Sequence, residues 1–251
     1  MIQIRGLEKS FGGVPVLRGV DLDVPEGEVT CIIGRSGSGK SVLMRHVIGL
    51  VTPDAGRVVI DGAPLAELTY SELRRVRRKF GVLFQGGALF DSMTARQNVE
   101  FPLRTFTDLS RAEVRDRADE CLALVELPDA GAKKPAELSG GQQKRVALAR
   151  AIAVEPKYIL YDEPTSGLDP ETSNTIDELI HRLGTTMGTT SVVVTHDMHS
   201  VLSIADRIAF VYDGRIHWSG TVSDLHRASD PTLLDFVRAN EYKIGAPSQT
   251  A

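Results

Sequence analysis

A glycine-rich run, set between an apolar strand and a helix, constrains the fold of this chain more than any other feature. The run consists of Gly34, Arg35, Ser36, Gly37, Ser38, Gly39, Lys40 and Ser41. Mostly apolar residues precede it at 29–33, and apolar residues recur at helical spacing from 42 to 50. A strand, a loop and a helix in this order present backbone N–H groups to the phosphates of a nucleotide. The sequence therefore predicts a nucleoside triphosphate site here.

Two side chains at the start of that helix have predicted roles. Lys40 is expected to reach the β- and γ-phosphates of ATP, and the Ser41 hydroxyl is expected to ligate Mg²⁺. The alternative is a glycine-rich turn that matches the pattern by chance. The strand before the run and the helix after it favour the nucleotide site over that alternative.

A second motif, which is acidic, follows the apolar stretch 158–161. Asp162 closes this predicted strand, where a buried carboxylate needs a strong partner such as Mg²⁺. Glu163 follows directly and is predicted to orient and deprotonate the water that attacks the terminal phosphate. The alternative for Asp-Glu-Pro is a helix cap or a turn.

Between these two motifs lies a short polar segment made of Ser139, Gly140, Gly141 and Gln142. Its serine and glutamine fit a capping box at the start of a helix. A capping box does not account for the two glycines, each of which destabilises a helix by about 1 kcal/mol relative to alanine. The glycines favour a helix N-terminus that a bulky anion approaches closely. We therefore predict that the Ser139 hydroxyl and nearby N–H groups contact a γ-phosphate.

These three motifs, in this order, resemble those of ATP-binding-cassette (ABC) ATPases, and the resemblance extends from Met1 to about Gly220. Alternating strands and helices independently predict an α/β fold with a mainly parallel sheet covered by helices on both faces. The resemblance implies a P-loop NTPase core with an N-terminal antiparallel β subdomain and an inserted α-helical lobe. It also implies hydrolysis of ATP with Mg²⁺. The γ-phosphate at Ser139 would then belong to ATP held by a second copy, in a head-to-tail homodimer with two composite sites.

Four further residues match this family by position. Gln85 resembles the glutamine that contacts Mg²⁺ or water, and Asp169 lies in a loop that resembles the one lining the dimer seam. His196 resembles the switch histidine that senses the γ-phosphate, and Phe11 lies where the family places an aromatic ring against adenine. The structural alternatives are, respectively, a polar strand end, a tight turn, a surface histidine and a core phenylalanine.

The family pattern predicts a division of the chain into three parts. Residues 1–85 and 156–220 form the nucleotide-binding core with its β subdomain, and residues 86–155 form the helical lobe. Residues 221–251 form a C-terminal helical tail. The segment from Ser223 to Tyr242 is predicted to be helical and packed, because it carries more apolar surface than a free tail should expose, at Leu225, Leu233, Leu234, Phe236 and Val237.

A narrower resemblance concerns residues 81–103. The runs Gln85-Gly-Gly-Ala-Leu-Phe90 and Asn98-Val-Glu-Phe-Pro-Leu103 are similar to runs in the ATPases of Mla and MCE lipid-transport systems. This resemblance implies a phospholipid substrate, integral membrane permease subunits and an MCE-domain protein as partners. The start of the lobe is expected to hold a coupling helix of the permease. Candidate groove residues are Leu89, Phe90, Val99 and Phe101, although ordinary core packing is the alternative for each.

Other functions stay open at this point. A polar amino-acid importer has a closely similar ATPase outside the lobe. Soluble ABC proteins of DNA repair or translation usually carry a coiled-coil insertion or a second cassette, and this sequence has neither. A net charge of −4 over 251 residues also argues against nucleic acid as a partner.

The remaining features of the sequence concern its location. The basic cluster at 74–79 is interpreted as a solvated helix face, with a membrane-headgroup contact as the alternative. Cys31 and Cys121 are predicted to be small core residues in a reducing compartment. No run of about 18 apolar residues occurs, and residues 1–5 do not resemble a signal peptide. We therefore expect a cytoplasmic protein that is peripheral on the inner membrane through its permease.

Overall fold

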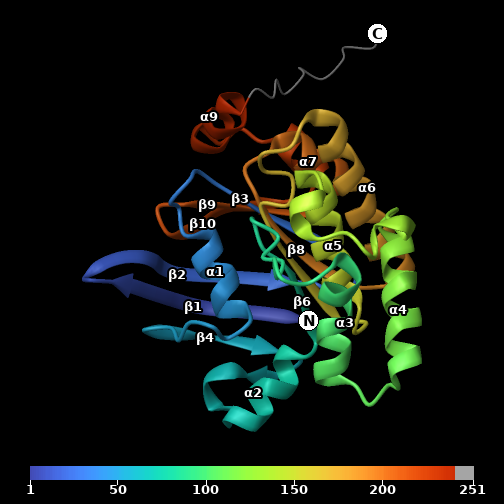
Figure 1. The fold of residues 1–251 in the computed structure, drawn as a ribbon. Coiled ribbons are helices and arrows are strands. Elements are labelled where there is room, and N and C mark those ends of the chain that lie inside the picture. The colour runs from blue at the N-terminus through green and yellow to red at the C-terminus, as the bar shows by residue number, and fades with distance from the viewer. Residues whose placement is uncertain (241–251) are drawn as a thin grey trace. The chain divides into compact units, whose positions relative to one another are not determined.

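The first strands of the chain form an antiparallel sheet. The computed structural model describes residues 1–240, and its β1 (Ile2–Phe11), β2 (Val14–Val24), β4 (Ala55–Ile60) and β5 (Ala63–Pro64) pair in the order β2-β1-β4-β5 (Figure 1). Ile2 lies opposite both Val24 of β2 and Ile60 of β4, and all three are buried. This burial follows the period of two that the sequence shows, since successive strand residues face opposite sides.

The other strands are mainly parallel, and most of them are buried. β3 (Val29–Ile33) runs parallel to β9 (Arg207–Tyr212), which forms an antiparallel hairpin with β10 (Arg215–Gly220). β6 (Phe80–Leu83) runs parallel to β7 (Tyr158–Asp162), and every residue of β7 and of β8 (Thr190–Thr195) is buried. Continuous apolar strands of this kind are typical of a parallel sheet covered on both sides. The predicted α/β fold is confirmed.

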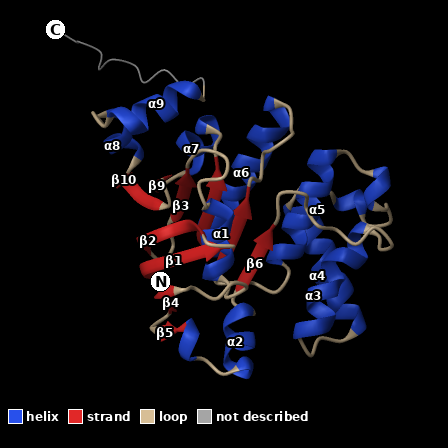
Figure 2. Ribbon diagram, turned by 90° about the vertical axis from the view of Figure 1, so that its left-hand side faces the viewer, coloured by secondary structure: helices blue, strands red, loops and turns tan. Residues whose placement is uncertain are grey.

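Helices account for most of the remaining chain (Figure 2). They are α1 (Lys40–Val47), α2 (Tyr70–Arg77), α3 (Ala95–Phe106), α4 (Arg111–Leu124), α5 (Gly140–Ile152), α6 (Pro170–Met187), α7 (Met198–Ile204), α8 (Val222–His226) and α9 (Pro231–Ala239). Short 3₁₀ turns occupy Leu65–Glu67, Pro128–Ala130 and Pro135–Glu137. Within residues 1–240, no helix combines the length and the apolar character needed to cross a bilayer.

Side-chain caps begin nearly every helix. In each of α2 to α9, a Ser, Thr or Asp at the N-cap accepts a hydrogen bond from a backbone N–H of the first turn. Such caps satisfy N–H groups that have no partner inside the helix. Among the α-helices of the described residues, α1 alone starts without one, because its N-cap is Gly39.

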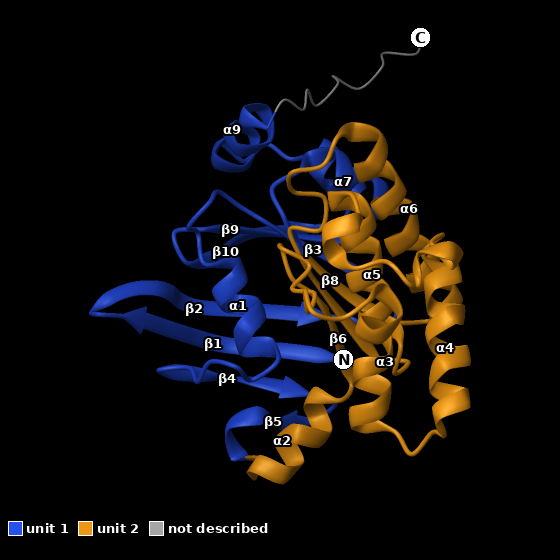
Figure 3. Ribbon diagram, viewed as in Figure 1, with its two compact units in different colours: residues 1–67, 194–251 blue, residues 68–193 orange. Residues whose placement is uncertain are grey.

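The chain forms two compact units (Figure 3). The first comprises residues 1–67 and 194–251, and the second comprises residues 68–193. The second unit contains α3, α4 and α5, which are the helical elements of the segment 86–155. The predicted division into a core and a lobe at residues 86 and 155 stays a prediction.

The C-terminal segment is helical and packed, as predicted. Within α8 and α9, the side chains of Leu225, Leu233, Phe236 and Val237 are buried. The Phe236 ring lies 5.1 Å from that of Phe210 in β9, between ring centroids. The part of the predicted tail at 241–251 lies outside the described residues.

The two cysteines are buried, as expected. Cys31 lies in β3 and Cys121 in α4, and neither side chain is exposed. Burial raises the pKa of the Cys121 thiol to about 11. Its thiolate is therefore scarce at neutral pH, and the residue serves packing rather than chemistry.

Candidate functional site

The loop at 34–41, which is predicted to bind phosphate, leads into a helix that starts without a side-chain cap. Gly39 has a φ of +100°, and a Cβ there would lie 2.9 Å from Leu17 Cδ2. Only glycine suits this position, so the chain gives up a side-chain cap on α1. The N–H groups of a first helical turn need acceptors, and a phosphate at this positive end of the helix supplies them.

Lys40 and Ser38 add to the fit of the loop to phosphate. The Lys40 ammonium is 6% exposed and donates to the carbonyl oxygens of Gly34 at 2.7 Å and Arg35 at 3.0 Å. The loop thereby holds a cation beside its own backbone. Ser38 Oγ is buried and has no hydrogen-bond partner within the described chain. A buried hydroxyl of this kind calls for a partner that the protein itself does not provide.

The acidic pair lies at the carboxyl end of β7. Asp162 is the last residue of the strand and is 8% exposed. Glu163 follows with a φ of +50°, which is the left-handed region of the backbone. A residue other than glycine in that region costs about 1–3 kcal/mol and persists only where its surroundings hold it. The chain therefore bends sharply at the residue predicted to act as the base.

Lys144 of α5 holds this bend. Its ammonium donates to the carbonyl oxygens of Pro164 at 2.7 Å, Ser166 at 2.8 Å and Glu163 at 3.2 Å. Burial lowers the pKa of Lys144, and the nearby Glu163 carboxylate opposes that shift. Lys144 is not among the residues predicted from the sequence. The available signal was a lysine on the apolar face of a helix, a place where lysine is rare unless it is paired.

The polar segment at 139–142 forms the capping box that was the structural alternative. Ser139 Oγ accepts from the Gln142 N–H at 3.3 Å, and Gln142 Oε1 accepts from the Ser139 N–H at 3.1 Å. Packing also explains one of its two glycines, because a Cβ on Gly141 would collide with the methyl group of Thr172 in α6. The same is not true of Gly140, where a Cβ would make only an ordinary contact with Leu168 at 3.7 Å. Close approach of an anion stays a prediction for Gly140, as does the phosphate contact of this segment.

Of the residues matched by position, Gln85 lies in a turn and Asp169 lies at the N-cap of α6. β6 ends at Leu83, so the alternative in which Gln85 is a polar strand end is wrong. A turn closed by the Gly87 N–H and the Phe84 carbonyl, at 2.7 Å, stops the strand and leaves Gln85 exposed. Asp169 caps α6 by accepting from the Thr172 N–H at 2.9 Å and its hydroxyl at 2.7 Å, and these bonds lower the pKa of Asp169. Its place at a dimer seam stays a prediction.

The other two are exposed in the first unit. The Phe11 side chain at the end of β1 is 48% exposed, so the alternative in which it is a core residue is wrong. The Lys9 ammonium lies 5.5 Å from the centre of its ring. His196 directly follows β8 and is exposed, which also fits the alternative of a surface histidine, so its role as a sensor stays a prediction.

The site residues divide between the two units. Phe11, the loop 34–41 and His196 belong to the first unit. Gln85, the segment 139–142 and the run from Asp162 to Asp169 belong to the second. Within the second unit, the three hydrogen bonds of Lys144 connect α5 to the loop after β7. Gly141, at the start of α5, also packs against Thr172 of α6.

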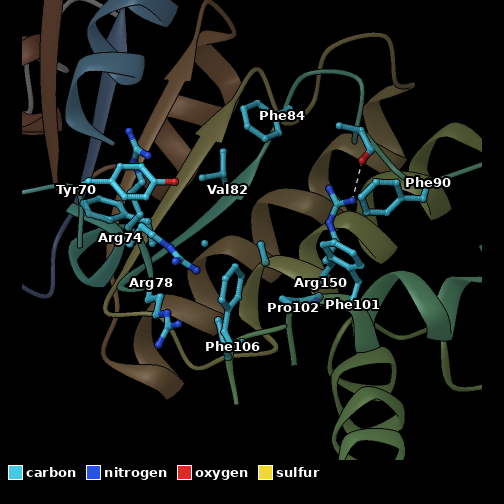
Figure 4. A pocket seen from close by; sticks show the side chains of 16 residues that line it. Tyr70, Arg74, Arg78, Val82, Phe84, Phe90, Phe101, Pro102, Phe106 and Arg150 are labelled. Carbon is cyan, nitrogen blue, oxygen red and sulfur yellow. Dashed lines mark hydrogen bonds between the residues drawn. The ribbon is translucent and has the colours of Figure 1, made fainter. Parts of the chain in front are cut away.

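The second unit also contains a groove of about 530 Å³ (Figure 4). Side chains of α2 and α3 face each other across it, and aromatic residues dominate: Tyr70, Phe84, Phe90, Phe101 and Phe106 are each at least 37% exposed. Four arginines also line the groove: Arg74, Arg77, Arg78 and Arg150. Arg78 lies over the Phe106 ring at 5.5 Å, and Arg150 donates to the carbonyl oxygens of Gly87 and Ala88.

The prediction of groove residues was correct in part. Phe90 and Phe101 line it, with ring centroids 4.8 Å apart. Val99 is fully buried in α3 and Leu89 does not line the groove, so the prediction for these two is wrong. Three arginines of the basic cluster, Arg74, Arg77 and Arg78, line this groove. Arg74, Arg75 and Arg78 are exposed, in agreement with the predicted solvated helix face.

Comparisons with known proteins agree with this geometry. The model of the family described as "ABC transporter" matches residues 17–166. The chain is 45% identical to the methionine import ATP-binding protein MetN of Caulobacter vibrioides, over 98% of this chain and 75% of that protein. It is 39% identical to the probable ribonucleotide transport ATP-binding protein mkl of Mycobacterium leprae, over 97% of this chain and 70% of that protein. A solved dimer of the ATP-binding cassette MJ0796 with ADP and Pi superposes with a TM-score of 0.82 and 39% identity, covering 88% of this chain and 99% of that one.

Proposed function

Because the chain belongs to the ABC transporter family, whose ATPase subunits couple ATP hydrolysis to transport, we propose that it drives phospholipid movement through membrane-embedded permease subunits. In this proposal the protein lies on the cytoplasmic face of the inner membrane. Two copies close head to tail around two ATP molecules, and an MCE-domain protein belongs to the same complex.

The residues of the two units have distinct roles in hydrolysis. In the first unit, the loop 34–41 and Lys40 bind the β- and γ-phosphates, Ser41 ligates Mg²⁺, Phe11 stacks on adenine and His196 senses the γ-phosphate. In the second unit, Asp162 and Gln85 contact Mg²⁺ or its water, and Glu163 takes the proton of the attacking water. Ser139 contacts the γ-phosphate bound by the opposite copy.

One observation carries the ATPase part of the proposal. Eight of the α-helices in residues 1–240 begin with a side-chain cap, and the helix after the phosphate loop does not. Its first turn is suited to a phosphate in place of the missing cap.

Replacement of Lys40 tests that part directly. Lys40→Ala removes the cation of the loop and should abolish ATP hydrolysis and strongly weaken nucleotide binding. Arg45→Ala is the matched control, because Arg45 is an exposed cation on the same helix. Turnover of the purified Lys40→Ala complex at the wild-type rate would exclude the assignment of the loop.

The groove of the second unit supports a permease partner. Exposed aromatic side chains gathered in a hollow mark interaction sites on soluble surfaces. Asn98 shapes one wall of this hollow: its amide accepts from the Phe90 N–H at 2.8 Å and donates to the Phe90 carbonyl at 3.2 Å. This buried asparagine, which opens the Asn-Val-x-Phe-Pro-Leu run, therefore positions a groove residue. We assign the groove to a coupling helix of the permease.

The lipid substrate rests on the similarity of residues 81–103 to lipid-transport ATPases. A methionine-type importer is the second candidate, and 45% identity to a methionine import ATPase favours it. Purification of the native complex in mild detergent separates the two. Lipid transport predicts an MCE-domain protein and bound phospholipid in mass spectra, whereas an importer predicts a solute-binding protein and no enrichment of lipid.

A further inference from the structure

The first unit, blue in Figure 3, contains a polar hollow of about 420 Å³. The hollow is lined in part by β2 and β10, which are edge strands of the two sheets. β2 is joined to the turn before β10, because the Arg18 N–H donates to the Gly214 carbonyl at 2.8 Å. Further along β2, the hollow is lined by residues of five strands: Arg5, Asp21, Leu22, Asp23, Thr30, Arg207, Ile208, Ala209, Ile216, Ser219 and Gly220.

A buried hydroxyl lines this hollow. Thr30 of β3 is 1% exposed, and its Oγ1 has no hydrogen-bond partner within the described chain. Thr30 lies opposite Arg207 in the parallel pairing of β3 with β9, so the two side chains share one face of the sheet. Because buried polar groups are nearly always hydrogen-bonded, a molecule bound in the hollow is a suitable partner for this hydroxyl.

Two arginines and two aspartates give the lining balanced charge. Asp23 Oδ1 accepts from Arg5 at 2.7 Å, and Asp21 Oδ1 accepts from a backbone N–H at 2.9 Å. Arg207 donates through Nε to Glu28 at 2.7 Å. Among the described residues, the second carboxylate oxygen of each aspartate and the two Nη groups of Arg207 have no hydrogen-bond partner. Acceptors and donors of opposite charge are therefore available in one hollow.

The balance of charge decides which class of ligand fits best. An anion is attracted by the arginines and repelled by the aspartates, and the reverse holds for a cation. A molecule with both an ammonium and a carboxylate group is attracted by both pairs. Its charged groups also form stronger hydrogen bonds than those of an uncharged molecule. The volume of the hollow lies within the range of about 300–1,000 Å³ that is typical of small-molecule sites.

We propose that this hollow binds a small zwitterion, of the size of an amino acid or a short peptide. The carboxylate of the ligand accepts hydrogen bonds from Thr30 Oγ1 and from the Nη groups of Arg207, and its ammonium group donates to Asp21 and Asp23. The proposal does not depend on the proposed function, because none of these four residues has a role in the binding or hydrolysis of ATP.

The experiment measures binding of zwitterions to the whole chain by calorimetry. Glycine, glycylglycine and triglycine differ in the separation of their charges, and at least one should bind with a Kd below about 1 mM. For that zwitterion, the analogue with an acetylated amine is an anion, the analogue with an amidated carboxylate is a cation, and the analogue with both changes is uncharged. The zwitterion should bind at least about tenfold more tightly than any of the three.

Matched variants locate the site. Thr30→Val removes the hydroxyl with little change in shape, and Asp21→Asn removes the charge but keeps an oxygen for the backbone N–H. Each should weaken the zwitterion about tenfold, whereas Asp213→Asn, at an exposed aspartate of the same unit outside the lining, should not. Thr30→Val should leave the Tm of the ligand-free chain unchanged or higher, because its hydroxyl has no partner within the described chain to lose.

Several results would overturn the proposal. They are no saturable binding of any of the three zwitterions, equal binding of a singly charged or uncharged analogue, and unchanged affinity in Thr30→Val or Asp21→Asn. A lower Tm of ligand-free Thr30→Val would give the hydroxyl a structural role and would also contradict the proposal. ATP binding is measured on the same samples: its absence would contradict the proposed function and leave the result for the zwitterion standing.

Discussion

At the scale of single residues, the most consequential contact is made by Lys144. One ammonium group accounts for three carbonyl oxygens in the four residues from Glu163 to Ser166. Those residues include the left-handed backbone of Glu163. The position of Glu163, the predicted base, therefore depends on a lysine of α5, so Lys144 is a positioning residue.

Replacement of Lys144 tests this dependence. Lys144→Met keeps the length of the side chain and removes its donors, so kcat should fall about 10- to 100-fold through misplacement of Glu163. The KM for ATP should change little, because the phosphate loop is intact. Lys144→Arg keeps a buried cation with several donors and should recover part of the activity. Steady-state ATPase kinetics provide the measurement, with thermal unfolding to verify that both variants are folded. Equal kcat values for the methionine and arginine variants would contradict the positioning role.

Glu163 itself gives a second prediction. Glu163→Gln should still bind ATP but should stop hydrolysis, because the amide cannot accept the proton of water. With no hydrolysis to reopen the interface, ATP should hold two copies together. Light scattering of the detergent-solubilised complex measures this as an ATP-dependent increase in dimer. A variant that hydrolyses ATP at the wild-type rate would remove Glu163 from the role of base.

At the scale of elements, carboxylate side chains stabilise the N-terminal ends of α8 and α9. Asp230 caps α9 by accepting from the Leu233 N–H at 2.8 Å, and its other oxygen lies 3.0 Å from His217 Nε2. In α8, Asp224 accepts from the Thr221 N–H at 2.9 Å and from its hydroxyl at 2.7 Å. These two bonds, and to a smaller extent a bond from Arg227, lower the pKa of Asp224 to about 2.

The sign of that shift predicts how α8 responds to acid. A carboxyl whose pKa is lower in the folded state stabilises the fold when it is ionised. This contribution is complete above the ordinary aspartate pKa of 3.8 and is lost as the pH falls through about 2. Asp224→Asn retains a polar cap that does not titrate. Amide hydrogen exchange in α8, corrected for intrinsic rates, should therefore become faster as the pH falls from about 4 to about 2. The increase should be larger in the wild type than in Asp224→Asn. The same acceleration in both proteins would show that Asp224 does not control the end of this helix.

Elements that are specified by neighbouring residues were predictable from the sequence. The strand, loop and helix around Gly34–Ser41 follow from apolar spacing and glycine, and β7 ends at Asp162 as its pattern indicates. The capping box at Ser139 was predicted as a geometric possibility, and the structure contains it.

Features that depend on distant partners were not predictable. Gly86 and Gly87 indicate the turn at 84–87, but they do not fix the residue at which β6 ends before it. Val99 and Phe101 are both apolar residues of one helix, yet only the packing of α3 decides that the first is buried and the second faces the groove. Similarly, the three acceptors of Lys144 lie about twenty residues along the chain, beyond the range of any helix or turn pattern.

At the scale of the whole molecule, the capping box on α5 raises the question of which ATP the segment serves. The solved cassette MJ0796 is a dimer bound to ADP and Pi, which provides a precedent for a dimer of such cassettes with nucleotide. Ser139→Arg would place a large side chain at the N-terminus of α5 and leave the mutant's own phosphate loop intact. If the segment acts across the interface, this lesion damages a site on the partner copy.

Mixed dimers test that arrangement. Ser139→Arg in one subunit and Lys40→Ala in the other should damage the same site and leave the second site whole. Both lesions in a single subunit should damage both sites. The ATPase rate of complexes purified with two different affinity tags should therefore be higher when the lesions lie on opposite subunits. The reverse order would mean that Ser139 serves the ATP of its own subunit, and the head-to-tail arrangement would be wrong.

The uncapped start of α1 also links folding to metabolism. In the proposed site a phosphate group completes the first turn of this helix, so nucleotide should bind the folded chain in preference to the unfolded one. At a nucleotide concentration one hundred times its Kd, mass action adds about 2.7 kcal/mol to the free energy of unfolding. A cell with abundant ATP would therefore hold more of this subunit folded than a starved cell. Energy supply would in this way set the lifetime of the transporter as well as its rate.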